Sequence, residues 1–219
     1  SDVNSILEID ESDKVLSHEL FQGGDKEAYN MSTDIFVVDT PFLIAKLEEE
    51  AAKEEPRKLR YVLRDLAVAE NAFAYEYTGY LSNIHSVKAY FDANLDMLES
   101  HKFYKLFAPN QKVYTKVKNE EPTYYSDSSE VKLSQFASGS IVRGKVENSV
   151  ISRNVDLSEG SSVSHSILFP RVKVAKGATV EYAIVDKGVE IAEGVTIRGT
   201  ENNPVVIKKG SVVTEDIVR

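Results

Sequence analysis

Apolar residues in the second half of the chain recur with a fixed period of 17 positions. The period spans three consecutive blocks, residues 149–165, 166–182 and 183–199. The blocks carry apolar side chains in five shared columns, and glycine in a sixth at Gly160, Gly177 and Gly194. One such block cannot bury its own apolar face, so neighbouring blocks must stack and bury it together.

The apolar columns predict the kind of stack. They are Val150/Ile167/Ile184, Ile151/Leu168/Val185, Val155/Val172/Val189, Leu157/Val174/Ile191 and Val163/Val180/Ile197. Their spacing within a block is near six, which is typical of the hexapeptide pattern of a left-handed parallel β-helix with three-sided coils. We expect these columns to fill the inside of the rod, with glycine at a corner where the backbone turns sharply. An antiparallel sandwich would instead place its turn residues at irregular spacing.

The first half of the chain follows a different pattern. Short apolar runs predict strands, and the residue Thr40 before Pro41 predicts a helix start, with the threonine hydroxyl as cap. Apolar residues three and four apart predict further helices, one of them capped by Ser86. The strands are expected at residues 4–9, 14–21, 34–38 and 73–81, and the helices at 40–51, 59–66 and 86–100. Alternating strands and helices indicate an α/β region.

These patterns divide the chain into three parts. We expect a partial nucleotidyltransferase-like α/β domain at residues 1–102, an interdomain linker at 103–130 and the β-helix at 131–219. The linker carries clustered charges, proline and aromatic residues, which are typical of a connection. The predicted fold class is therefore α/β plus all-β.

Charge and composition exclude several functions. The formal net charge of −9 argues against a nucleic-acid partner, because binding to phosphates needs a basic surface. The chain contains no cysteine, which excludes disulfides and thiolate metal sites and suits the reducing cytoplasm. No apolar run approaches the roughly 20 residues that span a bilayer, so we expect no membrane partner and a cytoplasmic location.

Three stretches resemble one enzyme family. Residues 136–197 resemble the C-terminal β-helix of the glucose-1-phosphate adenylyltransferases, also called ADP-glucose pyrophosphorylases. Residues 32–50 and 79–98 are similar to later segments of the family's catalytic domain, so the resemblance covers nearly the whole chain in the family's order. It implies a magnesium-dependent reaction in which glucose 1-phosphate and ATP give ADP-glucose and pyrophosphate for glycogen synthesis.

The chain departs from the family at the residues that the resemblance makes functional. The family's nucleotide-binding loop is rich in glycine and ends in arginine, whereas Gly23-Gly24 is expected to be a turn without a following basic residue. We therefore expect a C-terminal fragment. Asn83 stands where the family has its magnesium-binding aspartate, and a neutral amide attracts a hard dication much less. Ser32 matches a family serine, but Asp34 replaces the glycine after it.

These departures predict a degenerate sugar-phosphate pocket with Ser32 and Asn83 as its remaining residues. We expect no catalytic residue and no cofactor in this chain, magnesium serving the family reaction. Such losses resemble the D-type glycogen-biosynthesis subunit, which is not itself an efficient catalyst. The resemblance implies a regulatory or structural role beside the catalytic subunit of ADP-glucose pyrophosphorylase, in a mixed oligomer.

Two alternatives stay open. The chain could belong to a working sugar-phosphate nucleotidyltransferase whose metal site tolerates Asn83. It could also be a hexapeptide-repeat acyltransferase, in which His165 would be the base in a groove between the coils of a trimer. Because Tyr182 and Gly199 occupy the equivalent positions of the next two blocks, a corner residue facing solvent or another domain is the simpler interpretation of His165.

Overall fold

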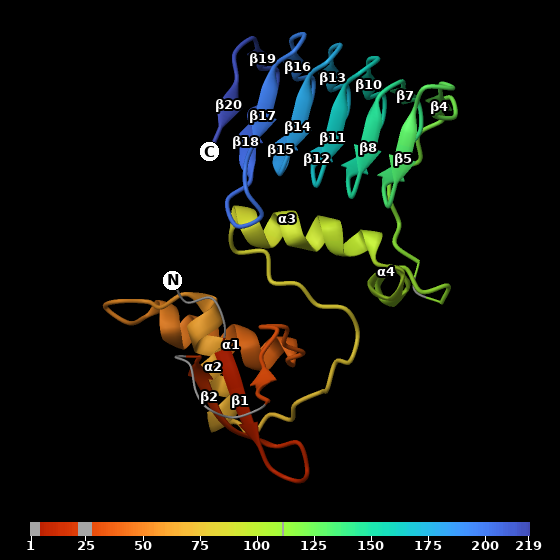
Figure 1. Cartoon of the computed structure of the whole chain (residues 1–219). Coiled ribbons are helices and arrows are strands. Elements are labelled where there is room, and N and C mark those ends of the chain that lie inside the picture. Colours follow the sequence, from red (N-terminus) through yellow and green to blue (C-terminus); the bar gives the residue numbers. More distant parts are fainter. Residues whose placement is uncertain (1–4, 22–27, 111) are drawn as a thin grey trace. The chain divides into compact units, whose positions relative to one another are not determined.

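The computed structural model describes residues 5–21, 28–110 and 112–219 (Figure 1). The chain forms two compact units, Ser1–Thr78 and Gly79–Arg219, called here the first and the second unit. The turn expected at Gly23-Gly24 lies outside the described residues. Within the described ranges, no helix is both long and apolar enough to cross a membrane.

The first unit is a small antiparallel sheet with two helices. Its strands are β1 (Ser5–Ile9), β2 (Val15–Leu20) and β3 (Asn30–Met31), arranged in the order β2-β1-β3. Its helices are α1 (Thr40–Ala51) and α2 (Leu59–Ala69), and α2 packs against β2. The buried apolar side chains of this unit are few: Val15, Val62 and Ala67 are the ones below a tenth exposed among its described residues.

The helix starts follow capping chemistry. Asp39 accepts a hydrogen bond from the Phe42 N–H at 3.0 Å, so Asp39 and not Thr40 is the N-cap of α1. The prediction was one residue late because both side chains can cap and the backbone of Asp39 is the extended one. In the second unit, Ser86 accepts a hydrogen bond from the Ala89 N–H at 3.1 Å, which confirms its predicted role.

Two predicted strands of the first half do not form. Residues 34–38 contain no strand, and residues 73–81 contain only an isolated bridge from Phe73 to Lys14. The backbone turns into the left-handed region at Asp34, where φ is 54°. Ile35 and Val37 are 79% and 102% exposed. An extended segment becomes a strand only when its N–H and C=O groups pair with a neighbour, and beyond the bridge at Phe73 the described residues form no such ladder with either segment.

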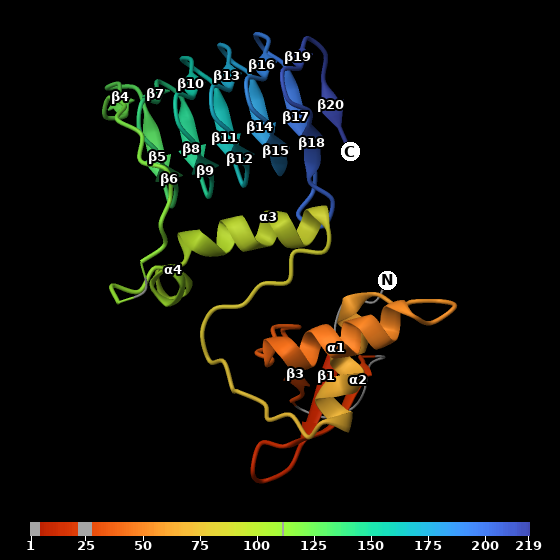
Figure 2. The same ribbon diagram turned by 180° about the vertical axis from the view of Figure 1, so that it is seen from behind.

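The second unit contains a parallel β-helix of three sheets (Figures 1 and 2), each named here after its first strand. The β4 sheet contains β4 (Tyr124–Tyr125), β7 (Ile141–Val142), β10 (Asp156–Leu157), β13 (Lys173–Val174), β16 (Glu190–Ile191) and β19 (Val212–Val213). The β5 sheet contains β5 (Glu130–Lys132), β8 (Lys145–Glu147), β11 (Ser162–Ser164), β14 (Thr179–Glu181), β17 (Thr196–Arg198) and β20 (Ile217–Val218). The β6 sheet contains β6 (Gln135–Phe136), β9 (Val150–Ile151), β12 (Ile167–Leu168), β15 (Ala183–Val185) and β18 (Val205–Ile207).

The strand register confirms the repeat. Val150 pairs with Ile167, and Ile167 pairs with Ile184, so partners in neighbouring coils are 17 residues apart. The repeated glycine lies at a corner as predicted, and at Gly177 the value of φ is 68°, which other residues rarely adopt. The expected class, a small α/β region followed by a parallel β-helix, is confirmed.

One apolar column lies on the outside of the rod, which corrects the prediction that all columns fill its interior. Neighbouring residues of a strand point to opposite sides, so Ile167 and Leu168 cannot both face inward. Leu168 belongs to the main core and is fully buried. Ile167 and Ile184 form a separate buried cluster on the outer face of the β6 sheet, together with Phe91.

A helical segment covers that outer face. It consists of α3 (Val87–Leu95), the 3-10 turn η1 (Asp96–Leu98) and α4 (Ser100–Leu106). Both views of the chain show α3 lying along the β-helix (Figures 1 and 2). Phe91 is 1% exposed, and the Gln135 side-chain amide donates a hydrogen bond to the Met97 carbonyl. Burying one such aromatic side chain contributes about 2–3 kcal/mol.

The boundary between the two units lies earlier in the chain than predicted, because the helical segment belongs to the second unit. The compact second unit begins at Gly79, whereas the sequence predicted an α/β domain to residue 102 and a linker over 103–130. The predicted linker holds the end of α4, all of β4 and the first residue of β5. The physical reason for the difference is that α3 buries Phe91 on the β-helix and that β4 pairs with β7.

Candidate functional site

A cluster of charged side chains in the first unit centres on Asp34. Asp34 follows β3 on a left-handed backbone, and its N–H donates a hydrogen bond to the Ser32 hydroxyl at 3.2 Å. The Ser32 N–H donates in turn to the Ser5 carbonyl of β1 at 2.8 Å. Ser32, which the sequence predicted as a pocket residue, thus holds the backbone of Asp34 against the sheet.

Two arginines of α2 converge on the Asp34 carboxylate. Arg60 and Arg64 are four residues apart and therefore lie on one face of the helix. Arg64 donates from Nε to Oδ1 at 3.1 Å and from Nη2 to Oδ2 at 2.8 Å, while Arg60 donates from Nη2 to the same Oδ2 at 2.9 Å. The Arg64 side chain is only 7% exposed, whereas that of Arg60 is 40% exposed. Forked guanidinium–carboxylate bonds of this kind are among the stronger hydrogen bonds in proteins.

A buried histidine completes the cluster. The His18 side chain on β2 is 1% exposed, and its Nε2 lies 3.0 Å from the Ser5 hydroxyl and 3.9 Å from Asp34 Oδ1. Burial and the nearby charge of Arg64 lower the pKa of His18 below its usual value, although Asp34 acts in the opposite direction. The imidazole is therefore neutral at pH 7. Its Nδ1 has no hydrogen-bond partner within the described ranges.

The Asp34 carboxylate is ionised at neutral pH. Partial burial acts to raise its pKa, but hydrogen bonds from Arg64 and Arg60 outweigh that effect and hold the pKa below the usual value. The cluster therefore places two permanent positive charges around one anion that the chain itself supplies. Chemically, this is an anion-binding arrangement whose anion is a side chain.

Asn83, the other predicted pocket residue, lies in the second unit. It is exposed, and its carbonyl oxygen accepts a hydrogen bond from the His85 N–H at 3.1 Å and lies 3.0 Å from His85 Nδ1. Leu81 and Ile84 beside it are both 56% exposed. Among the residues that the structure describes, no three His, Asp or Glu side chains gather as metal ligands would.

Sequence reasoning missed the residues that form the cluster. The apolar positions of α2 predict the helix without assigning a role to Arg60 and Arg64, and the pattern around His18 predicts only a strand. The available signal was the pair of arginines four residues apart, which places both on one face of α2. Nothing local connects that pair with Asp34, which lies 26 and 30 positions earlier in the chain.

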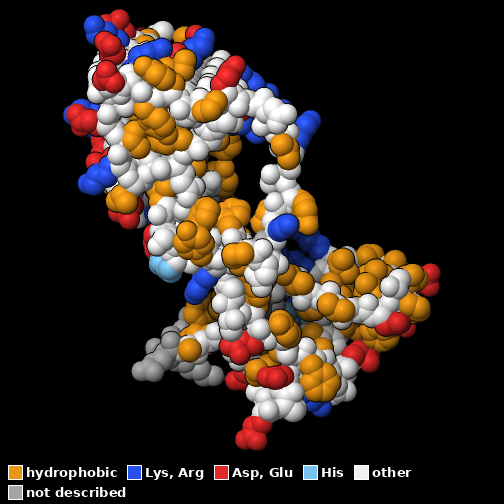
Figure 3. All heavy atoms as spheres, turned by 90° about the vertical axis from the view of Figure 1, so that its right-hand side faces the viewer, with side chains coloured by type: hydrophobic (Ala, Val, Ile, Leu, Met, Phe, Trp, Pro, Cys, Tyr) orange, Lys and Arg blue, Asp and Glu red, His pale blue; other side chains and the backbone are white. Residues whose placement is uncertain are grey.

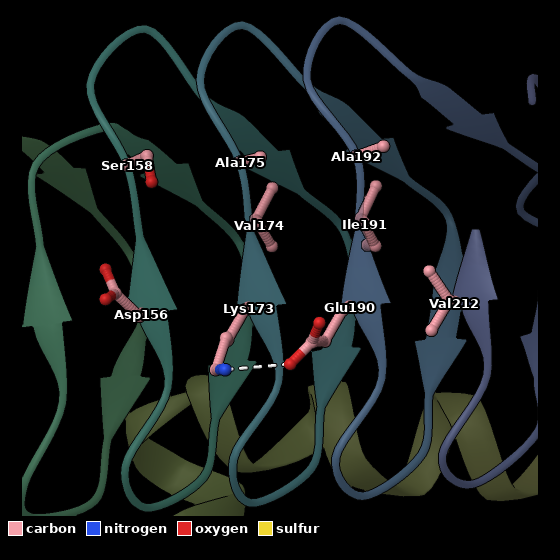
Figure 4. Close-up of a pocket in the computed structure, with 9 residues that line it drawn as sticks. All are labelled: Asp156, Ser158, Lys173, Val174, Ala175, Glu190, Ile191, Ala192 and Val212. Atoms are coloured by element: carbon pink, nitrogen blue, oxygen red, sulfur yellow. Dashed lines mark hydrogen bonds and ion pairs between the residues drawn. The ribbon is translucent and has the colours of Figure 1, made fainter. Parts of the chain in front are cut away.

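The outer face of the β4 sheet carries a shallow groove of about 330 Å³ (Figure 4). The small side chains of Ser158, Ala175 and Ala192 form one row beside the charged row of Asp156, Lys173 and Glu190. Lys173 and Glu190 form an ion pair at 2.7 Å. On the β-helix face drawn in Figure 3, positive and negative side chains are likewise interspersed.

His165 lies at a corner of the β-helix, as predicted. Its φ is 44°, its Nε2 lies 3.1 Å from the Asn148 side-chain amide, and its ring stacks on Tyr182 with 4.8 Å between centroids. The ring is half-buried and packed between neighbouring coils, so it faces solvent less than expected. With Phe91 of α3 it borders an open hollow of about 520 Å³. Its other ring nitrogen, Nδ1, is buried and has no hydrogen-bond partner among the described residues.

Comparison with known proteins finds a family model and several proteins that are similar to this chain. Residues 123–204 match the family model described as GlmU-like, C-terminal hexapeptide, in agreement with the left-handed β-helix. The chain is 34% identical over 197 residues to glycogen biosynthesis protein GlgD of Bacillus subtilis, covering 90% of this chain and 55% of that protein. It is 53% identical over 127 residues to GlgD of Geobacillus stearothermophilus, covering 58% of this chain and 37% of that protein.

The similarity extends to named enzymes. Glucose-1-phosphate adenylyltransferase of Clostridium acetobutylicum is 29% identical over 150 residues, which cover 67% of this chain and 39% of that protein. The chain thus spans about half, or less, of the length of these curated relatives. The matches confirm the resemblance that the sequence motifs indicated.

Proposed function

Because the chain is a relative of glycogen biosynthesis protein GlgD and of the glucose-1-phosphate adenylyltransferases, we propose that it acts as a non-catalytic regulatory or structural subunit in ADP-glucose synthesis. The reaction concerned joins ATP and glucose 1-phosphate to form ADP-glucose and pyrophosphate. The partner in this proposal is the catalytic subunit of ADP-glucose pyrophosphorylase, in a mixed oligomer. A subunit of an enzyme that uses ATP and sugar phosphates would work in the cytoplasm.

The observation that carries the proposal is the closed charge cluster around Asp34. A working sugar-phosphate pocket needs cationic groups that can meet the phosphate. Both guanidinium groups of the cluster are already bonded to Asp34, at 2.8 and 2.9 Å from one carboxylate oxygen. Asn83 supports the same conclusion, because a neutral amide holds magnesium poorly where the family resemblance expects a carboxylate.

The second unit supports the structural side of the proposal. Its β-helix is a continuous rod with an apolar interior, and α3 covers the apolar outer patch of the β6 sheet at Ile167 and Ile184. The other two sheets present paired charges, such as Lys173 with Glu190 and Arg198 with Glu181. Charged rows of this kind give register and specificity to contacts between subunits.

Co-expression of the full-length protein with a catalytic subunit tests the proposal. We expect affinity capture of one subunit to retain the other, and sedimentation to show a species larger than either alone. Coupling of about 1–3 kcal/mol between the subunits would shift the partner's apparent affinity for glucose 1-phosphate at least several-fold. The catalytic subunit expressed alone is the control. Unchanged sedimentation and unchanged kinetics in the mixture would contradict a subunit role.

A further inference from the structure

The outer face of the β4 sheet, which carries the groove of Figure 4, is exposed from its first strand to its last. Tyr124 on β4 is 60% exposed and Val212 on β19 is 67% exposed. We propose that this face binds the same face of a second copy of the chain, with the two β-helices antiparallel, in a dimer with two-fold symmetry. The inference concerns the second unit alone and does not depend on a role in ADP-glucose synthesis.

The side chains of this face are arranged in two rows. Leu157, Val174 and Ile191 are buried in the core, so the residues before and after them in each strand point outward. The residues before them are the charged row of Asp156, Lys173 and Glu190, and the residues after them are the small row of Ser158, Ala175 and Ala192 (Figure 4). The strand register continues the charged row through Ile141 to Tyr124 at one end and to Val212 at the other.

The charged row is complementary to its own reverse. A two-fold axis that runs along the strands, midway between β10 and β13, places the first strand of one copy opposite the last strand of the other. All six strands then overlap. Asp156 lies opposite Lys173 of the second copy, and Tyr124 lies opposite Val212 of the second copy. Symmetry repeats each of these contacts in the other direction.

The remaining charges of the face also find opposite charges in this arrangement. Glu190 lies opposite Ile141 of the second copy. Arg143 is two residues after Ile141 and therefore points to the same side, within reach of that glutamate. Within one chain, Arg143 already forms an ion pair with Asp156 at 2.9 Å. The small rows of the two copies oppose each other, so no bulky side chain keeps the sheets apart there.

Charge explains why this face suits a second copy. The chain carries a formal net charge of −9, so two copies repel each other on average. On this face Arg143 and Lys173 balance Asp156 and Glu190, which makes it neutral. Like charges that face each other across an interface are costly, and the antiparallel arrangement avoids them.

The size of the face sets the expected strength of the dimer. Six strands that lie about 4.8 Å apart make a face about 24 Å long. A single sheet face of this length is at the small end of specific interfaces, which typically bury about 800 Å² on each partner. The dimer is therefore weak and dissociates on dilution.

The test exchanges charges between copies. Sedimentation equilibrium of the full-length protein alone, from about 5 to 500 μM to cover a weak interface, should show a monomer and a dimer. Asp156→Lys and Lys173→Glu should each weaken the dimer at least tenfold, because each places two pairs of like charges opposite each other. An equal mixture of D156K and K173E should associate about as tightly as the wild type, because both opposing pairs again have opposite signs.

Lys145→Glu is the matched control. It makes the same charge change in a similarly exposed ion pair on the β5 sheet and should leave the dimer unchanged. Ala175→Gln, which adds bulk to the small row without charge, should weaken the dimer several-fold and serves if the charge variants do not fold.

Three results would overturn the proposal. The first is a wild-type protein that stays monomeric at the highest concentration. The second is a mixture of D156K and K173E that associates no better than either variant alone. The third is a dimer of wild-type strength in both charge variants, which would place the contact on another face. None of these results contradicts assembly with a catalytic subunit, which co-expression tests separately.

Discussion

The two units stabilise themselves in opposite ways. Along the β-helix, Leu157, Leu168 and Val180 are all 0% exposed, because each of their coils packs between neighbours with the same apolar pattern. In the first unit, Ile35 and Tyr75 are 79% and 91% exposed, and much of its organisation comes from ion pairs around Asp34. A repeat supplies its own partners, whereas a strand-like segment without repeats depends on residues far away in the chain.

The largest effect is expected where the helical segment meets the β-helix. Phe91→Ala should cost about 3–5 kcal/mol in local stability, because it empties a fully packed aromatic site over Ile167 and Ile184. Urea denaturation and hydrogen exchange of α3 measure the loss. Ile35→Ala in the first unit is the matched control and should change stability by less than about 0.5 kcal/mol. Equal losses for both changes would show that the two units do not differ in packing.

A smaller effect is expected at the corners of the β-helix. Gly177 has φ of 68°, and a Cβ built there would lie 4.0 Å from the Gly194 Cα, an ordinary contact, so Gly177→Ala meets no clash and adds only backbone strain of about 1–2 kcal/mol. Gly177→Asn should cost clearly less, because asparagine tolerates this conformation and Asn154 already adopts it with φ of 56°. Thermal denaturation of the two variants gives the comparison. A loss for asparagine as large as that for alanine would rule out backbone strain as the cause.

The first unit should lose stability in acid before the β-helix does. Hydrogen bonds from Arg57 and Lys53 lower the pKa of Glu50 to about 2, and Asp34 is shifted in the same direction. Because the folded-state pKa values lie below the unfolded ones, the stability these groups add is present above about pH 4.5 and is lost as the pH falls toward 2. Hydrogen exchange should therefore show the first unit losing protection before the β-helix core.

The control for the acid experiment is Asp34→Asn, which should remove the contribution of Asp34 to the pH dependence of the first unit, keep that of Glu50, and leave the pH dependence of the β-helix unchanged. Simultaneous loss of protection in both units between pH 4.5 and pH 2 would argue against the role assigned to these carboxylates.

The smallest effect is expected on the charged face of the β4 sheet. Lys173 and Glu190 are 64% and 53% exposed, so Lys173→Ala should change stability by less than about 1 kcal/mol. The same substitution should weaken capture by a catalytic subunit if this face carries subunit contacts. Lys145→Ala on the β5 sheet, whose ion pair with Glu130 is similarly exposed, is the matched control. A stability loss well above 1 kcal/mol would show that the surface pair holds the rod together.

Sequence periodicity predicted the β-helix well because every coil repeats the same local pattern. It failed at the column of Ile167 and Ile184, because two adjacent apolar columns cannot share one side and the helix that covers the outer one precedes the repeats in the chain. The candidate site was harder to predict. Ser32 came from family resemblance, while Arg64 and His18 join Asp34 only after the sheet and α2 have packed.

The central claim, a non-catalytic subunit, is tested most directly by pyrophosphate release. The full-length protein would be assayed alone with ATP, glucose 1-phosphate and magnesium. A catalytic subunit prepared in the same way would serve as the reference. We predict no release above the buffer blank, and altered kinetics only when the two are mixed. Release by the protein alone at a rate comparable to that of the catalytic subunit would contradict the account and favour a working nucleotidyltransferase that tolerates Asn83.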